Sequence, residues 1–282
     1  MIIDTHTHFY NPSRPQGVPW PPVSDQVLYR TVLPSHYRDI AEPFGVTGTV
    51  IVEASAWLED NQWVLDLAAA DPLIVGVVGN LEPCSDSFGE QVTRFAQNPL
   101  FRGIRLGGSW FQDVDNALFV SDMERLAAAE LGLDVLGNAS HVPGVAALAR
   151  RIPSLRIVVN HMALVRIDGG EPPADWRAGM ALLAEQPNVF MKASAATEIT
   201  TSEPASGDPD FYVPVFEALW QCFGEDRLVW GSDWPVCERA TPFETAFRVA
   251  ETFFESKGAR AMAKCFAGNA ERAYGLQCAR QG

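Results

Sequence analysis

Two histidines near the start of the chain, His6 and His8, have the spacing of a metal site. They follow a short apolar run at 1–4. Alternate side chains of a strand point to the same side, so both imidazoles are expected to face one way. Neutral imidazole is a common ligand of divalent metals. The pair therefore predicts the start of a metal-binding site. The alternative is that His6 and His8 are surface histidines that bind no metal.

Two further groups with useful chemistry follow apolar runs late in the chain. Asp233 lies in the motif GSDWP, directly after the run LVW, and His161 ends the run VVNH. A carboxylate there could hold a metal, take a proton from water, or cap a helix. His161 could bind a metal, polarise a carbonyl or shuttle a proton, or it could be a buried structural histidine.

Eight short apolar runs separated by helical stretches are expected to position these groups. Most runs are continuous in Val, Ile and Leu, which is typical of strands buried on both faces of a parallel sheet. The pattern predicts one α/β domain over 1–282, a TIM-type (β/α)8 barrel, because a doubly wound sheet would carry a glycine-rich phosphate loop after its first strand. The runs are 1–4, 48–55, 73–81, 101–108, 131–138, 155–163, 188–195 and 227–235, with helices expected at 61–70, 87–98, 120–132, 144–152, 174–186 and 212–224.

A barrel brings the late groups to the early ones. The eighth strand closes against the first, so Asp233 is expected beside His6 and His8 at the carboxyl ends of the strands. Long connections at 9–36 and 194–211 fall at the same end and are expected to form pocket walls or lids.

Composition excludes several classes of partner. The formal net charge is -14, from 35 acidic and 21 basic residues, so we expect no nucleic acid and no membrane surface as partners. No apolar stretch approaches the roughly 20 residues of a membrane span, and the first residues do not resemble a signal peptide. Five cysteines without a C-x-x-C pair favour reduced, mostly buried thiols and a cytoplasmic protein. The expected partner is a small-molecule substrate, and a homo-oligomer is left open.

Taken together, the motifs resemble the amidohydrolase superfamily, most closely its amidohydrolase-2 branch. The resemblance rests on DTHTH at 4–8, NH at 160–161 and GSDWP at 231–235, and it extends to FRGIR at 101–105, MKAS at 191–194 and GNAERAYGL at 268–276. This branch holds sugar-lactone and dicarboxylate-lactone hydrolases and metal-dependent decarboxylases. The resemblance implies that metal or water binding and proton transfer fall to four residues: His6, His8, His161 and Asp233.

The chain departs from the superfamily pattern where a further metal ligand is usual. The fourth run ends around Arg105, which would repel a cation, and the fifth ends at Asn138, which is a weak ligand. A divalent ion, zinc if any, is therefore expected at His6, His8 and Asp233, with His161 as a further candidate. The missing further ligand favours the lactonases of this branch, because they resemble this pattern and can work without a tightly bound ion. Whether this protein needs the ion is left open.

The remaining candidates are expected to bind substrate. Arg105 could hold a substrate oxygen or stabilise an oxyanion, or it could form a structural ion pair with Glu53. Glu53 could itself accept a sugar hydroxyl, and Lys192 could contact substrate or pair with Asp233. Asp4, one layer below the histidines, is expected to support them by hydrogen bonds. Loop aromatic rings suit sugar rings, and the further substrate-binding candidates are Asn138, Trp20 and Trp57.

These residues favour hydrolysis of a small lactone, most simply of a sugar acid. Asp233 would activate water, and Arg105 or His161 would stabilise the oxyanion. The alternative in the same fold is metal-dependent, non-oxidative decarboxylation of an unsaturated or aromatic acid. A third possibility is a barrel without catalytic activity that binds a small molecule, but such a chain should have lost His6, His8 or Asp233.

Overall fold

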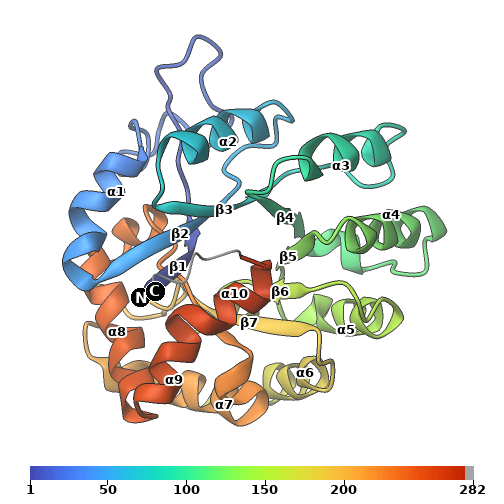
Figure 1. Cartoon of the computed structure of the whole chain (residues 1–282). Coiled ribbons are helices and arrows are strands. Elements are labelled where there is room, and N and C mark those ends of the chain that lie inside the picture. The colour runs from blue at the N-terminus through green and yellow to red at the C-terminus, as the bar shows by residue number, and fades with distance from the viewer. Residues whose placement is uncertain (277–282) are drawn as a thin grey trace.

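Eight parallel strands form the centre of the molecule, in the sheet order β1 to β8 (Figure 1). The structure is a computed structural model and describes residues 1–276. A parallel bridge between Thr7 and Trp234 closes the sheet, so the predicted (β/α)8 barrel is confirmed. The strands are β1 (Ile2–Thr7), β2 (Val46–Val52), β3 (Ile74–Gly79), β4 (Phe101–Gly107), β5 (Gly132–Leu136), β6 (Ile157–Val159), β7 (Val189–Ala193) and β8 (Leu228–Trp230).

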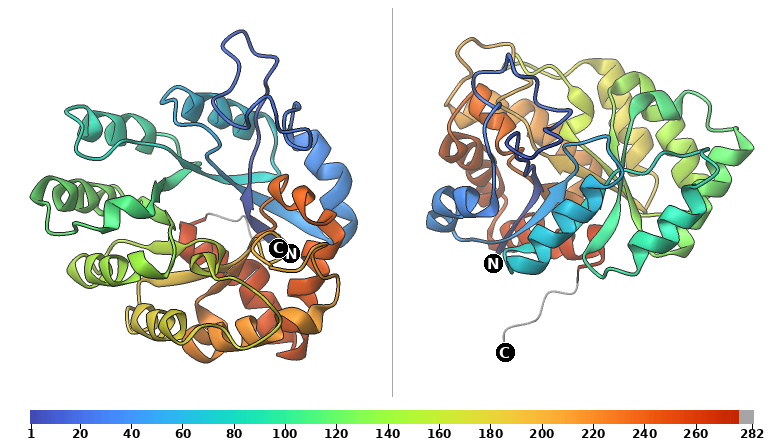
Figure 2. Two further views of the ribbon diagram at one scale, coloured as in Figure 1. Left: turned by 180° about the vertical axis from the view of Figure 1, so that it is seen from behind. Right: turned by 90° about the horizontal axis from the view of Figure 1, so that it is seen from above.

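Helices surround the barrel on its outside, as the views from two further directions show (Figure 2). The six predicted helices are α2 (Asp60–Ala70), α3 (Phe88–Ala96), α4 (Ala117–Ala128), α5 (Val142–Arg151), α6 (Ala174–Ala184) and α7 (Val213–Phe223). Four further helices were not predicted: α1 (Pro34–Ala41), α8 (Phe243–Ser256), α9 (Ala259–Ala263) and α10 (Asn269–Tyr274). The first long connection is therefore slightly shorter than expected, because α1 begins within 9–36.

Side chains fill the barrel interior at the end where α10 lies. Val52, Val158 and Val229 point inward from three strands and form a core cluster with Ala273 and Tyr274 of α10. Figure 1 looks along the barrel from this end and shows α10 crossing its centre. The C-terminal helix thus closes the amino ends of the strands and leaves their carboxyl ends as the open mouth.

The connection after β1 lies over that mouth, at the end of the molecule opposite the N-terminus (Figure 2). Its two ends pair through Tyr10 N to Val32 O (3.0 Å) and Val32 N to Tyr10 O (2.8 Å). Ion pairs of Arg30 with Glu238 and of Arg239 with Asp25 join it to the segment after β8. Residues 9–33 therefore form a fixed wall at the barrel mouth.

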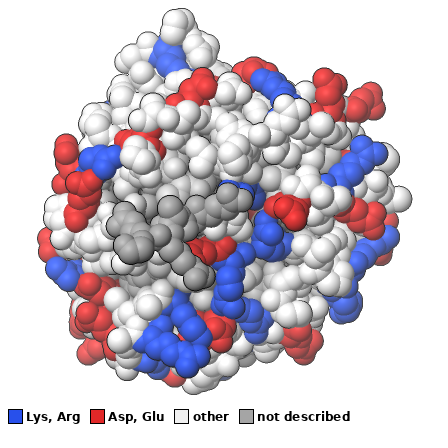
Figure 3. All heavy atoms as spheres, viewed as in Figure 1, with Lys and Arg blue, Asp and Glu red and all other residues white. Residues whose placement is uncertain are grey.

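Charged side chains of both signs lie on the surface of the molecule. Figure 3 shows acidic and basic side chains interspersed around the face seen in Figure 1. None of the helices in residues 1–276 is both long and apolar enough to cross a membrane.

The cysteines of the described residues are free thiols. Cys237 and Cys265 are buried, and Cys84 and Cys222 are partly exposed. Cys278 lies outside the described residues.

Candidate active site

His6, His8 and Asp233 meet at the barrel mouth, as the strand pattern predicted. Asp233 Oδ1 lies 3.4 Å from His6 Nε2 and 3.2 Å from His8 Nε2, and all three side chains are buried. The closing hydrogen bonds between β1 and the segment after β8 set this geometry: Asp233 N donates to His6 O (2.9 Å), and His8 N donates to Trp234 O (2.9 Å). Barrel closure thus brings together groups more than 220 residues apart in sequence.

Strained backbone holds two of the site residues. Asp233 has φ 60°, and His161 has φ 52° at the start of a left-handed turn that runs to Leu164. A left-handed conformation costs a residue with a side chain about 1–2 kcal/mol, and it persists only where its surroundings enforce it. Trp176 Nε1 donates to Met162 O (2.8 Å) and holds the turn. Such strain at the ends of two barrel strands is typical of a functional site.

Asp4 ties the first and last strands together beneath the histidines. Its Oδ1 accepts from His6 N (3.0 Å) and Ser232 N (2.9 Å), and its Oδ2 accepts from Tyr37 Oη (2.6 Å). These bonds fix the backbone that carries His6 and Asp233. Asp4 therefore lies in the supporting position that the sequence predicted.

The partners of His8 determine which of its nitrogens carries the proton. His8 Nδ1 lies 2.8 Å from Val52 O, an acceptor, so the proton is on Nδ1 and Nε2 has a free lone pair. Its 3.2 Å contact with Asp233 then needs a proton on the carboxyl group or a cation shared by the two atoms. His8 Nε2 can therefore accept a proton or bind a metal.

Lys192 does not line the pocket, contrary to one expectation. Its Nζ is fully buried and donates to Thr5 O (2.9 Å), Asp134 Oδ2 (2.9 Å) and His6 Nδ1 (3.1 Å). Its ion-pair partner is Asp134 on β5, not Asp233, because the side chain from β7 crosses the barrel below the mouth. An ammonium group only donates, so neutral His6 carries its ring proton on Nε2, the atom that faces Asp233.

Burial controls the protonation of the site. Desolvation lowers the pKa of His8 to about 3, and it lowers the pKa values of His6 and His161 well below the usual range. Desolvation also raises the pKa of Asp233 to about 7, although the charges of Arg105 and Lys192 oppose this shift. At neutral pH the histidines are uncharged, and a pKa near 7 suits the Asp233 carboxyl group to act as a general base.

A cavity of about 420 Å³ opens above these groups. Trp20 lies over it, with its ring 5.7 Å from that of His8. The cavity lining is half apolar, which suits a small ring with polar substituents. The lining residues are His8, Pro19, Trp20, Glu53, Ala54, Ser55, Ala56, Arg105, Leu136, His161, Asp233 and Val236.

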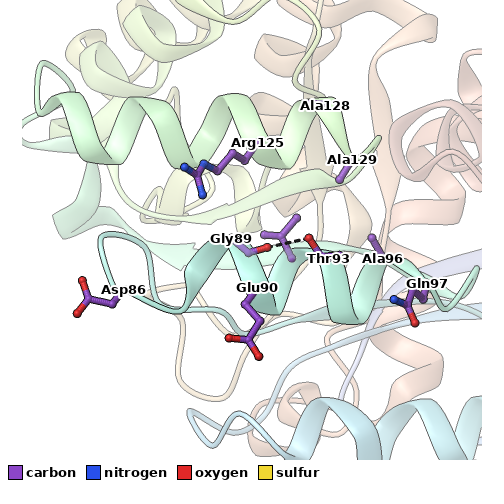
Figure 4. A pocket seen from close by; sticks show the side chains of 10 residues that line it. Asp86, Gly89, Glu90, Thr93, Ala96, Gln97, Arg125, Ala128 and Ala129 are labelled. Carbon is purple, nitrogen blue, oxygen red and sulfur yellow. Dashed lines mark hydrogen bonds between the residues drawn. The ribbon is translucent and has the colours of Figure 1, made fainter.

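A larger hollow of about 650 Å³ lies on the outside of the barrel between α3 and α4. Figure 4 shows Asp86, Glu90 and Arg125 spread along its edges, with small side chains between them. These charged groups do not converge on one point. The cavity at the barrel mouth is therefore the candidate active site, despite its smaller size.

Besides Lys192, two of the predicted substrate contacts are absent from the lining of this cavity. Asn138 is exposed, and its Oδ1 accepts from Ser140 N (3.0 Å) and Ser140 Oγ (2.7 Å) as a helix cap. Trp57 is 40% exposed and lies outside the lining. By contrast, Trp20, Glu53 and Arg105 line the cavity as predicted, although Arg105 and Glu53 also form an ion pair (2.9 Å).

The sequence analysis missed two polar groups near the site. Ser194 Oγ lies 2.8 Å from His161 Nδ1 and orients that ring. Burial, together with the charge of Asp233, raises the pKa of Glu198 to about 8. Its Oε1 is buried and has no hydrogen-bond partner among the described residues. Both residues follow β7, in or beside the predicted loop at 194–211, but a lone Ser or Glu in a polar loop gives no signal of its own.

The donor atoms at the mouth fit a divalent ion. One nitrogen from each of His6 and His8 and one oxygen of Asp233 lie within 4.8 Å of one another. His6 Nε2 is buried and has no hydrogen-bond partner among the described residues, so a bound group would satisfy it. Three protein ligands plus water is a common arrangement for catalytic zinc. An ion at His6 would have to displace the proton that Lys192 directs to Nε2.

Comparison with known proteins identifies the family to which the chain belongs. A family model described as Amidohydrolase matches residues 3–276. An L-fucono-1,5-lactonase of Burkholderia ambifaria is 34% identical over 250 residues, covering 86% of this chain and 82% of the relative. A second L-fucono-1,5-lactonase, from Burkholderia multivorans, is 29% identical over 292 residues, covering 98% and 96%.

A solved structure is also similar over the whole chain. An amidohydrolase of Burkholderia multivorans with bound zinc superposes with a TM-score of 0.84 at 26% identity, covering 98% of this chain and 99% of the other. The family match spans nearly all the described residues, and the ordered motifs at the ends of β1, β6 and β8 lie within it. This chain therefore belongs to the amidohydrolase family.

Proposed function

We propose that this protein hydrolyses the lactone of a sugar acid. The observation that carries the proposal is the Asp233 carboxyl group, buried against two neutral histidines at the floor of a cavity of about 420 Å³. The similarity to two L-fucono-1,5-lactonases supports a sugar lactone as substrate, and L-fucono-1,5-lactone is the first compound to test.

Asp233 is the proposed general base. Its ionised form would take a proton from water and direct the resulting nucleophile at the lactone carbonyl. When the tetrahedral intermediate collapses, Asp233 would return that proton to the ring oxygen, so one carboxyl group serves both steps. Its pKa near 7 suits both directions of transfer.

Two fixed hydrogen-bond donors, His6 and Arg105, would stabilise the oxyanion. His6 points its Nε2 proton toward Asp233, and that proton has no acceptor among the described residues. Arg105 donates Nε and Nη2 to Glu53, which leaves Nη1 for the substrate. Donors fixed before the reaction stabilise developing negative charge more strongly than mobile water does.

A divalent ion could add to this chemistry. His6, His8 and Asp233 would hold it, with zinc as the proposed ion, since zinc is bound in the similar amidohydrolase structure. Such an ion polarises carbonyl groups and acidifies water when bound. His161 stands beside this set, with its ring centre 4.5 Å from that of His6, and is proposed to contact the substrate instead.

A pH-indicator assay over a panel of aldonolactones, with L-fucono-1,5-lactone among them, tests the proposal. Hydrolysis releases a proton, so the wild-type protein should acidify the solution in proportion to substrate consumed. The Asp233→Asn variant should lose this activity, while Asp113→Asn, at an exposed site away from the cavity, should keep it. No acid from any lactone, together with carbon dioxide release from an aromatic acid, would overturn the proposal.

A further inference from the structure

The ion pair between Glu53 and Arg105 lies in the wall of the active-site cavity. We infer that Glu53 makes the site selective for lactones without a carboxylate, because it occupies the face of Arg105 that would bind one. This inference concerns the substrate class of the site and rests on the proposed function.

Glu53 is bound to Arg105 in the way that a substrate carboxylate would be bound. Arg105 Nε donates to Glu53 Oε1 (2.9 Å), and Nη2 lies 2.9 Å from the same oxygen and donates to Glu53 O (2.8 Å). An arginine binds a carboxylate most strongly through two parallel N–H groups on one edge. Glu53 uses the Nε and Nη2 edge, so a substrate carboxylate cannot dock there side-on.

The position of Glu53 is fixed by its strand. It directly follows β2, and its backbone N donates to Val78 O (2.8 Å) on β3. Its side chain is 19% exposed and that of Arg105 is 14% exposed, so little water screens the pair. Weak screening makes the contact strong, and a substrate anion would have to displace it.

The other cations near the site are also neutralised. Besides Arg105, the charges of Lys192 and Arg239 act on Asp233. Lys192 is paired with Asp134, and Arg239 with Asp25, and neither cation lines the cavity. Among the described lining residues, Arg105 is the one Lys or Arg, against two carboxyl groups, Glu53 and Asp233.

Without a bound metal ion, the side chains that line the cavity therefore offer no net positive charge to a ligand. An ionised substituent would lose its water and gain no free counter-charge, which disfavours its binding. Arg105 Nη1, which donates to no described residue, remains a donor for a hydroxyl or carbonyl oxygen. Arg105 thus acts as a charge-compensated hydrogen-bond donor, and Glu53 determines that a neutral lactone is preferred.

Equilibrium binding of two open-chain probes tests the inference without requiring turnover. Galactarate carries a carboxylate at each end, and galactitol is the uncharged polyol with the same number of carbons. Calorimetric titration of the chelator-treated wild-type protein should show no preference for galactarate. In Glu53→Gln, the freed guanidinium should raise the affinity for galactarate by about tenfold or more and leave galactitol unchanged.

A double variant tests whether Arg105 causes the gain in galactarate affinity. Glu53→Gln combined with Arg105→Gln should lose the gain, because the freed cation is gone. The control is Glu59→Gln, which removes the same kind of charge from an exposed pair with Arg94 outside the cavity and should change neither affinity. If Glu53→Gln does not fold, Glu53→Ala tests the same point, since it keeps the backbone carbonyl that Arg105 also binds.

The outcomes separate this inference from the proposed function. A folded Glu53 variant without a gain for galactarate overturns the inference, as does a gain that persists in the double variant. An inactive lactone screen with a tenfold gain would instead overturn the proposed function and leave the role of Glu53 standing. Lactone turnover without any gain in galactarate affinity would overturn the role of Glu53 and leave the proposed function standing.

Discussion

At the scale of single residues, the site depends on groups whose ordinary chemistry is changed by burial. Asp233 is held in a left-handed conformation against two histidines that stay uncharged. The sequence revealed Asp233, His6, His8 and His161 because each lies at the end of an apolar run or shortly after one. It did not reveal Ser194 or the pairing of Lys192 with Asp134, because these contacts depend on how strands distant in sequence are aligned.

The pKa of Asp233 leads to a prediction for the pH dependence of activity. A general base works when ionised, so kcat/KM for a lactone should rise with pH and level off above about 7. The histidines do not titrate in this range, because desolvation keeps their pKa values far lower. Initial rates between pH 5 and 9 measure the profile, with spontaneous hydrolysis subtracted. A flat profile would remove Asp233 as the base.

Replacing Asp233 by Asn should lower activity by about 10²–10⁴-fold and raise stability at high pH. The raised pKa means that the folded protein binds more protons than the unfolded chain between about pH 4 and 7, so stability falls as pH rises through this window. Asn carries no charge and avoids this cost, which for a pKa raised from 3.8 to about 7 is on the order of 4 kcal/mol above pH 7.

Thermal unfolding of chelator-treated protein at pH 8 measures the effect. The difference between Asp233→Asn and wild type should shrink as the pH falls toward 4, because the Asp233 carboxyl group is then protonated in the folded protein and becomes protonated in the unfolded chain as well. Asp113→Asn should behave as wild type, because its side chain is exposed. A variant less stable than wild type at pH 8 would show that the ionised carboxylate stabilises the fold.

At the scale of elements, buried polar bridges join strands that are not neighbours. Lys192 of β7 reaches Asp134 of β5 and Thr5 of β1 in the barrel interior. Tyr274 of α10 donates to the same carboxylate (3.1 Å), so the helix that closes the barrel is tied to the layer beneath the site. The sequence predicted the strands from local periodicity, but α10 was missed because its place inside the barrel depends on the finished fold.

Lys192→Met should destabilise the protein strongly. It leaves Asp134 buried without its cation, a change that typically costs about 3–5 kcal/mol. Adding Asp134→Asn should recover part of this loss, because no charge is then left unpaired. Urea unfolding of the single and double variants provides the comparison. Equal stability of Lys192→Met and wild type would mean that the pair contributes nothing net.

At the scale of the whole molecule, the two ends of the barrel have separate roles. The C-terminal helix seals one end, and the wall at 9–33 covers the other, so the site lies at the bottom of a cup. The fold class followed from eight apolar runs that alternate with helices. The metal could not be decided from sequence, because the usual further ligand is missing while the orientation of the remaining donors depends on barrel closure.

Zinc binding is expected to raise the thermal stability of the whole protein. A ligand that binds only the folded state at 100 times its Kd adds about 2.7 kcal/mol. This gain should vanish in His8→Gln, which lacks one of the three donors, and should persist in His141→Gln, whose ring lies outside the donor set. Scanning calorimetry with and without added zinc measures the change in Tm. An equal shift in His8→Gln would place the ion elsewhere.

The central claim is that water, activated by Asp233, attacks the acyl carbon of a sugar lactone. Turnover of L-fucono-1,5-lactone in water enriched in oxygen-18, followed by mass spectrometry of the product, tests it most directly. The account predicts one labelled oxygen in the carboxylate of each product molecule from the wild-type protein, and no catalysed incorporation by Asp233→Asn. Label in the ring hydroxyl instead, or labelled product formed as fast by the variant, would contradict it.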